Sequence, residues 1–203
     1  TIKILPVQNT PFSTNKTLNI NGRLIDLSVP KIMGVLNVTP DSFFDGGRYQ
    51  AESAIVAQAE KMLSAGADFI DIGGYSSRPG AADISLEEDK ARVVGVVSAH
   101  LSEFGGTIVS VDTFRSDVAQ AAADAGASMI NDISGGNLDP EMLATVSRLK
   151  VPYIVMHMRG NPQNMNTQTQ YGHLIRELID FFHKKISVLR QYEVKDIIID
   201  PGF

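Results

Sequence analysis

The order of apolar and polar positions from residue 31 onward is typical of a protein in which strands and helices alternate. Short apolar runs are separated by longer stretches in which apolar residues recur every three or four positions. The short runs predict buried strands, and the longer stretches predict amphipathic helices. Strands are expected at 31–36, 68–72, 108–111, 128–130, 153–156 and 196–199, and helices at 51–65, 85–103, 115–125, 140–149 and 171–191.

Residues at the expected helix boundaries support this division. Ser85 followed by Glu88 forms a capping-box pattern, and Asp139 before Pro140 predicts the start of another helix. Gly66 and Gly126 stand where two helices should stop, because glycine tolerates the left-handed conformation found there. The 1–30 segment differs: residues 17–27 alternate apolar and polar side chains around Asn21-Gly22, which predicts a β-hairpin.

Alternating strands and helices indicate a parallel α/β sheet, which is either an open doubly wound sheet or a barrel. Nearly every expected strand runs into polar groups, whereas a doubly wound sheet concentrates its site at one switch point. Polar strand ends favour a (β/α)8 TIM barrel: they are Asn37, Gly73-Gly74 with Ser76 to Arg78, Asp112-Thr113, Asn131-Asp132, His157 and Asp200. Such a barrel has eight strands and only six are expected here, so the sequence predicts an N-terminal strand and hairpin extension (1–30) and a barrel domain (31–203) that lacks roughly its last two βα units.

Composition narrows the class of protein. A length of 203 residues suits one domain, and the net charge of −5 with scattered Lys and Arg argues against a nucleic-acid surface. There is no cysteine, which excludes disulfides, thiolate metal sites and Cys nucleophiles. No apolar run approaches the ~20 residues of a membrane span, and no basic-then-apolar leader pattern begins the chain. We therefore expect a cytoplasmic protein without a membrane partner.

Two strand-end segments suit an anion and its counter-ion. The side-chain oxygen of Asn37 could hold Mg²⁺, which prefers oxygen ligands, although an Asn before Thr39-Pro40 also commonly caps a turn. Residues 76–80 bring two hydroxyls, the Arg78 guanidinium and glycine backbone together, which suits a phosphate group; a surface turn with a solvated Arg is the alternative. The P-loop pattern is absent, so nucleotide hydrolysis is not indicated.

Asp112, Asn131 and Asp200 end three different strands. Two carboxylates and an amide facing one cavity could bind a heterocycle rich in N–H donors, such as a pterin or a purine. The alternative is that each caps a following helix, which is more plausible for Asp112 beside Thr113 than for Asp200 before Pro201-Gly202. His157 lies among apolar neighbours and is interpreted as a core residue rather than a base, while His100, His173 and His183 are expected to be solvated on helices.

Taken in order, these motifs resemble the dihydropteroate synthase family of pterin-binding barrels. The matching segments are Asn37-Val38-Thr39-Pro40-Asp41-Ser42-Phe43, Asp71-Ile72-Gly73-Gly74, Ser77-Arg78-Pro79-Gly80, Val111-Asp112-Thr113, Asn131-Asp132, Met156-His157-Met158, Gly160-Asn161-Pro162 and Asp200-Pro201-Gly202-Phe203. Each segment is weak evidence by itself, but the ordered set from residue 31 to the end is highly specific. Tyr75 and Ser77 depart from the family pattern, since many members carry Glu and Thr at these positions.

The resemblance implies a transferase of folate biosynthesis that joins 6-hydroxymethyl-7,8-dihydropterin diphosphate to p-aminobenzoate and releases diphosphate. It implies that Asp112, Asn131 and Asp200 bind the pterin ring, that Met156 is a further substrate-binding residue, and that Asn37 binds Mg²⁺ on the diphosphate. It further implies that Ser77 and Arg78 lie near the diphosphate and the aminobenzoate. Phe43 and Pro79 would border the p-aminobenzoate pocket, where sulfonamides would compete. Asp112, Asp200 and Arg78 are the expected catalytic residues.

Two other functions remain open at this point. A methyltetrahydrofolate methyltransferase of the same pterin-binding class also uses Asp and Asn at strand ends, although it needs no diphosphate site. The other alternative is a non-catalytic pterin-binding module or fragment, because the family's later Ser-x-Lys and Arg-x-His segments are absent from residues 1–203. A homodimer through outer helices is compatible with a barrel, but no residue in the sequence indicates the surface.

Overall fold

The computed structural model describes residues 16–38, 48–75 and 84–202, with side chains described from residue 53 onward in the first long helix. Six parallel strands form one sheet in sequential order. These strands are β3 (Met33–Asn37), β4 (Phe69–Gly73), β5 (Ile108–Asp112), β6 (Met129–Asp132), β7 (Tyr153–Met156) and β8 (Ile197–Asp200). Because each strand pairs with the next one along the chain, right-handed crossovers all fall on one face, as in a barrel and unlike a doubly wound sheet.

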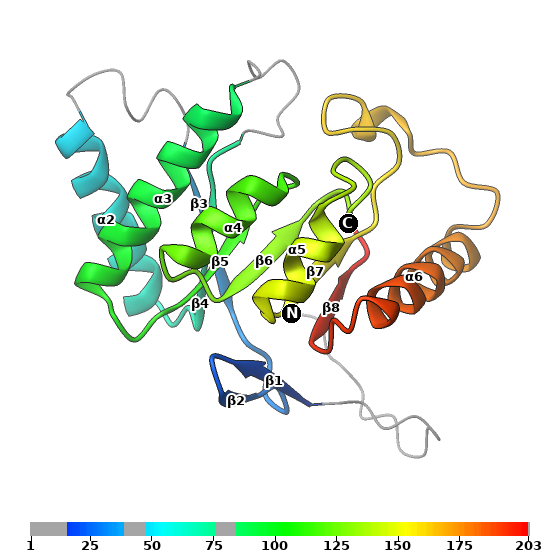
Figure 1. The fold of residues 1–203 in the computed structure, drawn as a ribbon, viewed down its shortest axis with the longest axis horizontal. Coiled ribbons are helices and arrows are strands. Elements are labelled where there is room, and N and C mark those ends of the chain that lie inside the picture. The colour runs from blue at the N-terminus through cyan, green and yellow to red at the C-terminus, as the bar shows by residue number, and fades with distance from the viewer. Residues whose placement is uncertain (1–15, 39–47, 76–83, 203) are drawn as a thin grey trace.

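Helices cover the outer face of this sheet (Figure 1). They are α2 (Arg48–Ser64), α3 (Leu86–Glu103), α4 (Ser116–Asp124), α5 (Met142–Leu149) and α6 (Leu174–Gln191), with the 3₁₀ turn η1 (Met165–Thr167) before α6. Buried strand residues such as Ile70, Val111 and Val155 pack with helix residues such as Val97 and Phe182 in the larger hydrophobic cluster. All six predicted strands and all five predicted helices are confirmed, with boundaries displaced by at most a few residues.

The boundary signals are confirmed in part. The Ser85 hydroxyl accepts a hydrogen bond from the Glu88 backbone N–H at 3.2 Å, while the Glu88 carboxylate pairs with Arg92 instead of closing the capping box. Gly66 and Gly126 have φ values of 101° and 109° at the ends of their helices, as predicted.

The predicted start of α5 was wrong by two residues. The helix begins at Met142, and the Asp139 carboxylate accepts hydrogen bonds from the backbone N–H of Glu141 at 2.9 Å and of Ser116 at 2.6 Å. Asp139 therefore caps the turn that leads into α5 and also satisfies an N–H donor at the start of α4.

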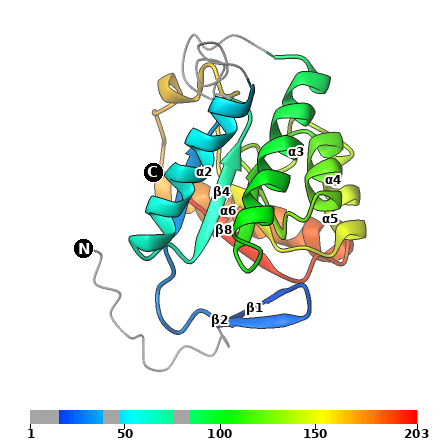
Figure 2. The same cartoon turned by 90° about the vertical axis from the view of Figure 1, so that its left-hand side faces the viewer.

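The predicted hairpin is present as β1 (Thr17–Ile20) and β2 (Arg23–Asp26), which pair in antiparallel fashion. Its turn residues Asn21 and Gly22 have φ values of 51° and 80°, the positive angles that a type I′ turn requires. Figure 2 shows the hairpin below the sheet, at the end where the strands begin. Hydrogen bonds join the Asn19 N–H to Asp196 and the Asn21 amide to Ser128, both at 3.0 Å.

Leu18 and Ile20 of the hairpin form a second hydrophobic cluster with Phe69, Met129 and Ile154 of the sheet. This cluster closes the inner side of the barrel at its strand-start end. The division of the chain into 1–30 and 31–203 as domains stays a prediction. Within residues 16–38, 48–75 and 84–202, no helix is both long and apolar enough to cross a membrane.

Candidate active site

The inner face of the sheet changes from apolar to polar along each strand. In a parallel sheet, residues paired side by side point to the same face, and every second residue along a strand shares that face. Asn37 pairs with Gly73, Gly73 with Asp112, and Asp112 with Asn131. This row lies four residues beyond Phe69 of the inner apolar cluster, so it forms a polar layer at the strand-end side of the same face.

Asp200 and Met156 belong to the same polar layer but lie further along their strands. Asn131 pairs with Ile154, Ile154 pairs with Ile198, and Met156 pairs with Asp200, two residues beyond. The offset of two keeps both side chains on the inner face. The structure thus brings Asp112, Asn131 and Asp200 to one face and one end of the sheet, as the sequence predicted.

Asn131 is oriented by a residue to which the sequence assigned no role. Its Nδ2 donates a hydrogen bond of 2.9 Å to Oδ2 of Asp71, whose side chain is 3% exposed. The other amide atom, Oδ1 of Asn131, is buried and has no hydrogen-bond partner among the described residues. A buried acceptor without a donor is costly, so this oxygen favours a ligand that offers an N–H or O–H group.

Asp71 could have been found from the alternation in its strand. It stands between Phe69 and Gly73, which share the inner face, and it is the charged residue within an otherwise apolar run. Burial raises the pKa of the Asp71 carboxyl, and the nearby Ser110 hydroxyl and the hydrogen bond from Asn131 offset part of that rise. Asp71 therefore supports the polar layer from below.

Asp112 is the most strongly perturbed carboxyl group of this layer. Burial raises its pKa well above the ordinary value, and the neighbouring carboxylates of Asp71, Asp132 and Asp89 raise the pKa further. A carboxyl group in this environment is stabilised in its ionised form by any ligand that brings hydrogen-bond donors or positive charge. The environment of Asp112 thus suits an N–H-rich ring.

Asn37 and Asp112 flank a position that glycine keeps open. A Cβ atom added at Gly73 would lie 3.5 Å from Oδ1 of Asn37 and 3.7 Å from Oδ2 of Asp112. The Asn37 side chain is exposed at the end of β3. Its carbonyl oxygen is therefore available to a ligand on the inner face.

The alternative that these residues only cap helices is not supported for Asp112. The N-cap of α4 is Arg115, whose backbone N–H donates to the Thr113 hydroxyl at 3.1 Å. Asp200 does accept a local hydrogen bond of 2.8 Å from the Gly202 N–H, which forms a turn rather than a helix cap. The second oxygen of Asp200 remains available to a ligand.

Asp132, next to Asn131, has a structural role outside the polar layer. Its buried carboxylate accepts hydrogen bonds from the Tyr153 hydroxyl at 2.7 Å, the Ser134 N–H at 2.7 Å and the Gly136 N–H at 2.8 Å. Burial raises the pKa of Asp132, and these donors offset part of the rise. The group anchors the loop that follows β6 and faces away from the polar layer.

His157 is buried as interpreted, although it also lines the cavity beside Asp200, and the interpretation of His100 as solvated is wrong. His157 is 9% exposed and packs edge-on against Phe181, with ring centroids 4.9 Å apart; burial and then the Arg159 charge lower its pKa. His100 is fully buried on α3 against Phe104, because the face of α3 that carries it packs into the core. His173 is exposed at the N-cap of α6, and His183 is exposed on α6.

A cavity of about 460 Å³ adjoins Asp200 at the strand-end side of β7 and β8. Met156, Met158, Arg159 and Tyr171 are among its lining residues. Phe43, Ser77, Arg78 and Pro79 lie outside the described residues.

Comparison with known proteins decides the family. The sequence pattern of the family described as pterin binding enzyme matches residues 33–203. The chain belongs to this family. The resemblance drawn from the strand-end motifs is thereby confirmed.

The relatives that resemble this chain include dihydropteroate synthases. The dihydropteroate synthase of Synechocystis is 47% identical over 173 residues, which cover 84% of this chain and 60% of that protein. The dihydropteroate synthase of Escherichia coli is 40% identical, and the alignment covers 90% of this chain and 64% of that protein. The chain therefore spans less than two thirds of the length of these relatives.

Solved structures confirm the barrel class. Dihydropteroate synthase of Xanthomonas albilineans with 4-aminobenzoic acid has a TM-score of 0.82 at 38% identity, and the match covers 94% of this chain and 67% of that one. Dihydropteroate synthase of Yersinia pestis with a sulfonamide drug complex has a TM-score of 0.83 at 41% identity, covering 92% and 68%. The matched region corresponds to about two thirds of each of those chains.

Proposed function

We propose that this protein is a dihydropteroate synthase that condenses 6-hydroxymethyl-7,8-dihydropterin diphosphate with p-aminobenzoate to give 7,8-dihydropteroate and diphosphate. The observation that carries the proposal is the polar layer in which Asp112, Asn131 and Asp200 share the inner face at the strand ends. The dihydropteroate synthase relatives, at up to 47% identity, supply the substrate class. We also propose that the protein acts in the cytoplasm.

The pterin ring is the ligand whose chemistry fits the polar layer. Its amino group and ring N–H groups are donors, and they suit the buried Oδ1 of Asn131 and the carboxyl groups of Asp112 and Asp200. Several acceptors around one flat ring would fix its orientation. Met156 shares the inner face with Asp200 and would pack against the ring.

Asn37 fits a role as a magnesium ligand. In the described parts of the chain, no three His, Cys, Asp or Glu side chains come together as a metal site. Mg²⁺ commonly keeps several waters and takes only one or two protein oxygens together with substrate phosphates, so a single exposed amide oxygen suffices. The ion would neutralise charge on the diphosphate as it leaves.

The chain's own residues then account for the remaining steps. Loss of diphosphate leaves a positive methylene on the pterin, which the Asp112 and Asp200 carboxylates stabilise by charge. The amine of p-aminobenzoate attacks that carbon and loses a proton. Arg78 and Ser77 would bind the anionic groups of both substrates, while Phe43 and Pro79 would border the p-aminobenzoate pocket; these four assignments stay predictions.

Two measurements test the proposal. Calorimetry should show binding of the pterin diphosphate that strengthens with Mg²⁺, and an enzymatic assay should show formation of dihydropteroate. Asp200→Asn should lower turnover by roughly 100-fold, since one charge-stabilising group is removed. Near-normal turnover in that variant would contradict the role of Asp200.

The other outcomes separate the alternatives. Pterin binding that is indifferent to diphosphate and Mg²⁺ would favour a methyltetrahydrofolate methyltransferase. Pterin binding without product would favour a non-catalytic module, which the span of 60% of the Synechocystis relative keeps open. Sedimentation of the same sample would show whether the protein is a homodimer.

A further inference from the structure

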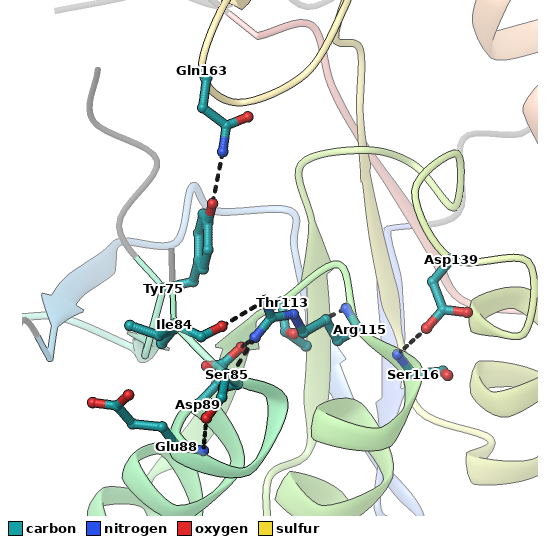
Figure 3. Close-up of polar contacts among 10 residues, drawn as sticks. All are labelled: Tyr75, Ile84, Ser85, Glu88, Asp89, Thr113, Arg115, Ser116, Asp139 and Gln163. Carbon is teal, nitrogen blue, oxygen red and sulfur yellow. Dashed lines mark hydrogen bonds and ion pairs between the residues drawn. The ribbon is translucent and has the colours of Figure 1, made fainter. Parts of the chain in front are cut away.

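A network of contacts joins three loops at the strand-end side of the sheet; Figure 3 shows its polar contacts, and aromatic contacts add to them. Tyr75 follows β4, Arg115 follows β5, and Gln163 follows β7. The loops also contain or adjoin residues of the proposed site, because Asp112 ends β5 and Met156 ends β7. The network therefore lies where it can set the spacing between parts of that site.

The Arg115 guanidinium is the centre of the network. Its Nη1 forms an ion pair of 3.1 Å with Oδ2 of Asp89, and its Nη2 donates a hydrogen bond of 2.9 Å to the Ile84 carbonyl. The Asp89 and Arg115 side chains are 2% and 19% exposed, so the pair is largely removed from water. A planar guanidinium with donors used in two directions has little freedom to turn.

The same guanidinium contacts both residues that flank segment 76–83. It lies over the Tyr75 ring, 5.5 Å from the centroid, and it holds the Ile84 carbonyl on the other side. Arg115 thus sets the separation of the two points between which Ser77 and Arg78 occur in the sequence. This arrangement is specific to an Arg, because a Lys ammonium is a point charge and could not serve both positions in one plane.

Tyr75 extends the network to the loop after β7. Its ring packs edge-on against Phe114 with centroids 5.0 Å apart, and its hydroxyl accepts a hydrogen bond of 2.8 Å from Nε2 of Gln163. The turn that carries Gln163 is itself held by side chains: Asn161 accepts from the Gln163 N–H at 3.1 Å, and Asn164 accepts from the Asn161 N–H at 2.8 Å. The bridge thus connects two locally ordered elements that are 88 residues apart in the sequence.

We propose that Arg115, Tyr75 and Gln163 are positioning residues that hold the described parts of the loops after β4, β5 and β7 in one arrangement beside the polar layer. The inference rests on the proposed function, since the loops are expected to bind the anionic groups of the substrates while strand-end side chains bind the ring. Loosening the network should therefore weaken p-aminobenzoate binding and leave binding of a pterin without diphosphate unchanged.

The central test compares Tyr75→Phe, Gln163→Ala and the double variant. Tyr75→Phe removes only the hydroxyl and keeps the ring contacts, so the fold should keep its melting temperature. Each single change should raise KM for p-aminobenzoate roughly fivefold, the effect of one lost hydrogen bond, with kcat within about twofold. The double variant should be no worse than either single variant, because both remove the same bond.

Matched controls come from the far end of the molecule. Tyr192→Phe and Gln191→Ala change exposed residues at the end of α6 and should leave every constant unchanged. Affinity for 6-hydroxymethyl-7,8-dihydropterin, measured by calorimetry, should be equal in all variants. The proposal would be overturned by an unchanged KM for p-aminobenzoate in Tyr75→Phe, or by a double variant whose KM rises by the product of the two single effects. A loss of pterin affinity as large as the loss for p-aminobenzoate would also overturn it.

Arg115→Lys and a second readout keep the test independent of activity. The variant retains the positive charge beside Asp89 but loses the guanidinium that bonds Asp89 and Ile84 together. Amide hydrogen exchange should therefore rise at residues 84–86. Tyr75→Phe should likewise speed exchange at residues 161–164, and unchanged exchange at these amides would contradict the network. If the wild-type protein binds no pterin, the proposed function fails, whereas the exchange result still decides whether the network holds the loops.

Discussion

The two ends of the inner face differ in composition and in their effect on folding. At the strand-start end, Leu18 and Ile20 of the hairpin cover Phe69, Met129 and Ile154, which are all nearly fully buried. At the strand-end side, the same face carries the polar layer of Asn37, Asp112, Asn131 and Asp200. The two ends lie only a few residues apart along each strand, yet one stabilises the fold and the other is the proposed ligand site.

The difference is one of solvation. Burying apolar side chains at the strand-start end lowers the free energy of the folded state. Burying carboxyl groups at the strand-end side raises it, as the upward pKa shifts of Asp71 and Asp112 indicate. Substitutions at the apolar end should consequently change the free energy of unfolding, whereas substitutions in the polar layer should change pterin affinity.

The largest effect is expected at the apolar end. Phe69→Ala should lower the free energy of unfolding by about 3–5 kcal/mol, because it removes a buried aromatic side chain and leaves a cavity. Pterin affinity, measured at a temperature where the variant is still folded, should be unchanged. Leu24→Ala is the matched control, since Leu24 of the hairpin lies at the same end of the molecule but is 73% exposed. A selective loss of pterin affinity without destabilisation would break the distinction between the two ends.

The next largest effect is expected at Asp112. Asp112→Asn keeps the size of the side chain and should weaken pterin binding by about 100-fold, because it removes a charged acceptor. Calorimetric titration measures the change, and Asp180→Asn on the exposed face of α6 serves as the control. Binding that is as tight as in the wild type would exclude Asp112 from the ring contacts.

The pH dependence of stability gives a smaller but diagnostic effect. The pKa of Asp112 is raised in the folded state, so its contribution to stability is complete below the ordinary value near 3.8 and is lost as the pH rises through the raised pKa. Asp112→Asn removes this loss, and the variant should gain stability relative to the wild type between pH 4.5 and pH 8. Urea unfolding at both pH values measures the gap; a gap that shrinks toward pH 8 would show that the ionised carboxylate stabilises the free protein.

The smallest effect is expected in the hairpin turn. Gly22 has a φ of 80°, so Gly22→Ala should cost about 1 kcal/mol of unfolding free energy through backbone strain. Thermal unfolding measures the cost, and no change in pterin affinity is expected, because the turn lies at the apolar end. The control variant is Gly106→Ala. At Gly106 φ is not positive, and an added Cβ meets nothing within 4 Å.

Local signals in the sequence predicted most of the fold. Apolar periodicity located every described strand and helix, and Asn21-Gly22 predicted the hairpin turn because positive φ angles favour these residues. The predicted start of α5 differs by two residues, and the bond from the Ser116 N–H to Asp139 is a long-range contact that no local pattern reveals. The burial of His100 is likewise hidden in the sequence, because it depends on which face of α3 meets the core.

The residues of the candidate site also divide into those that the sequence indicates and those that only the structure reveals. The sequence identified Asn37, Asp112, Asn131 and Asp200, since polar residues at strand ends stand out against apolar runs. It assigned no role to Asp71, although the alternation within β4 placed that side chain on the inner face. It also contained no sign of the Tyr75–Gln163 hydrogen bond, because the two residues are remote along the chain.

The sequence alone determined the strand and helix order, the family and the chemical types at the strand ends, because these depend on local patterning and on which side chains are present. Only the tertiary structure decided which of these groups meet. The register of six strands placed Asp112 beside Asn131, and packing beneath them buried Asp71 and raised the pKa of Asp112. Solvation and contact between distant residues are properties of the folded arrangement, and a linear pattern does not contain them.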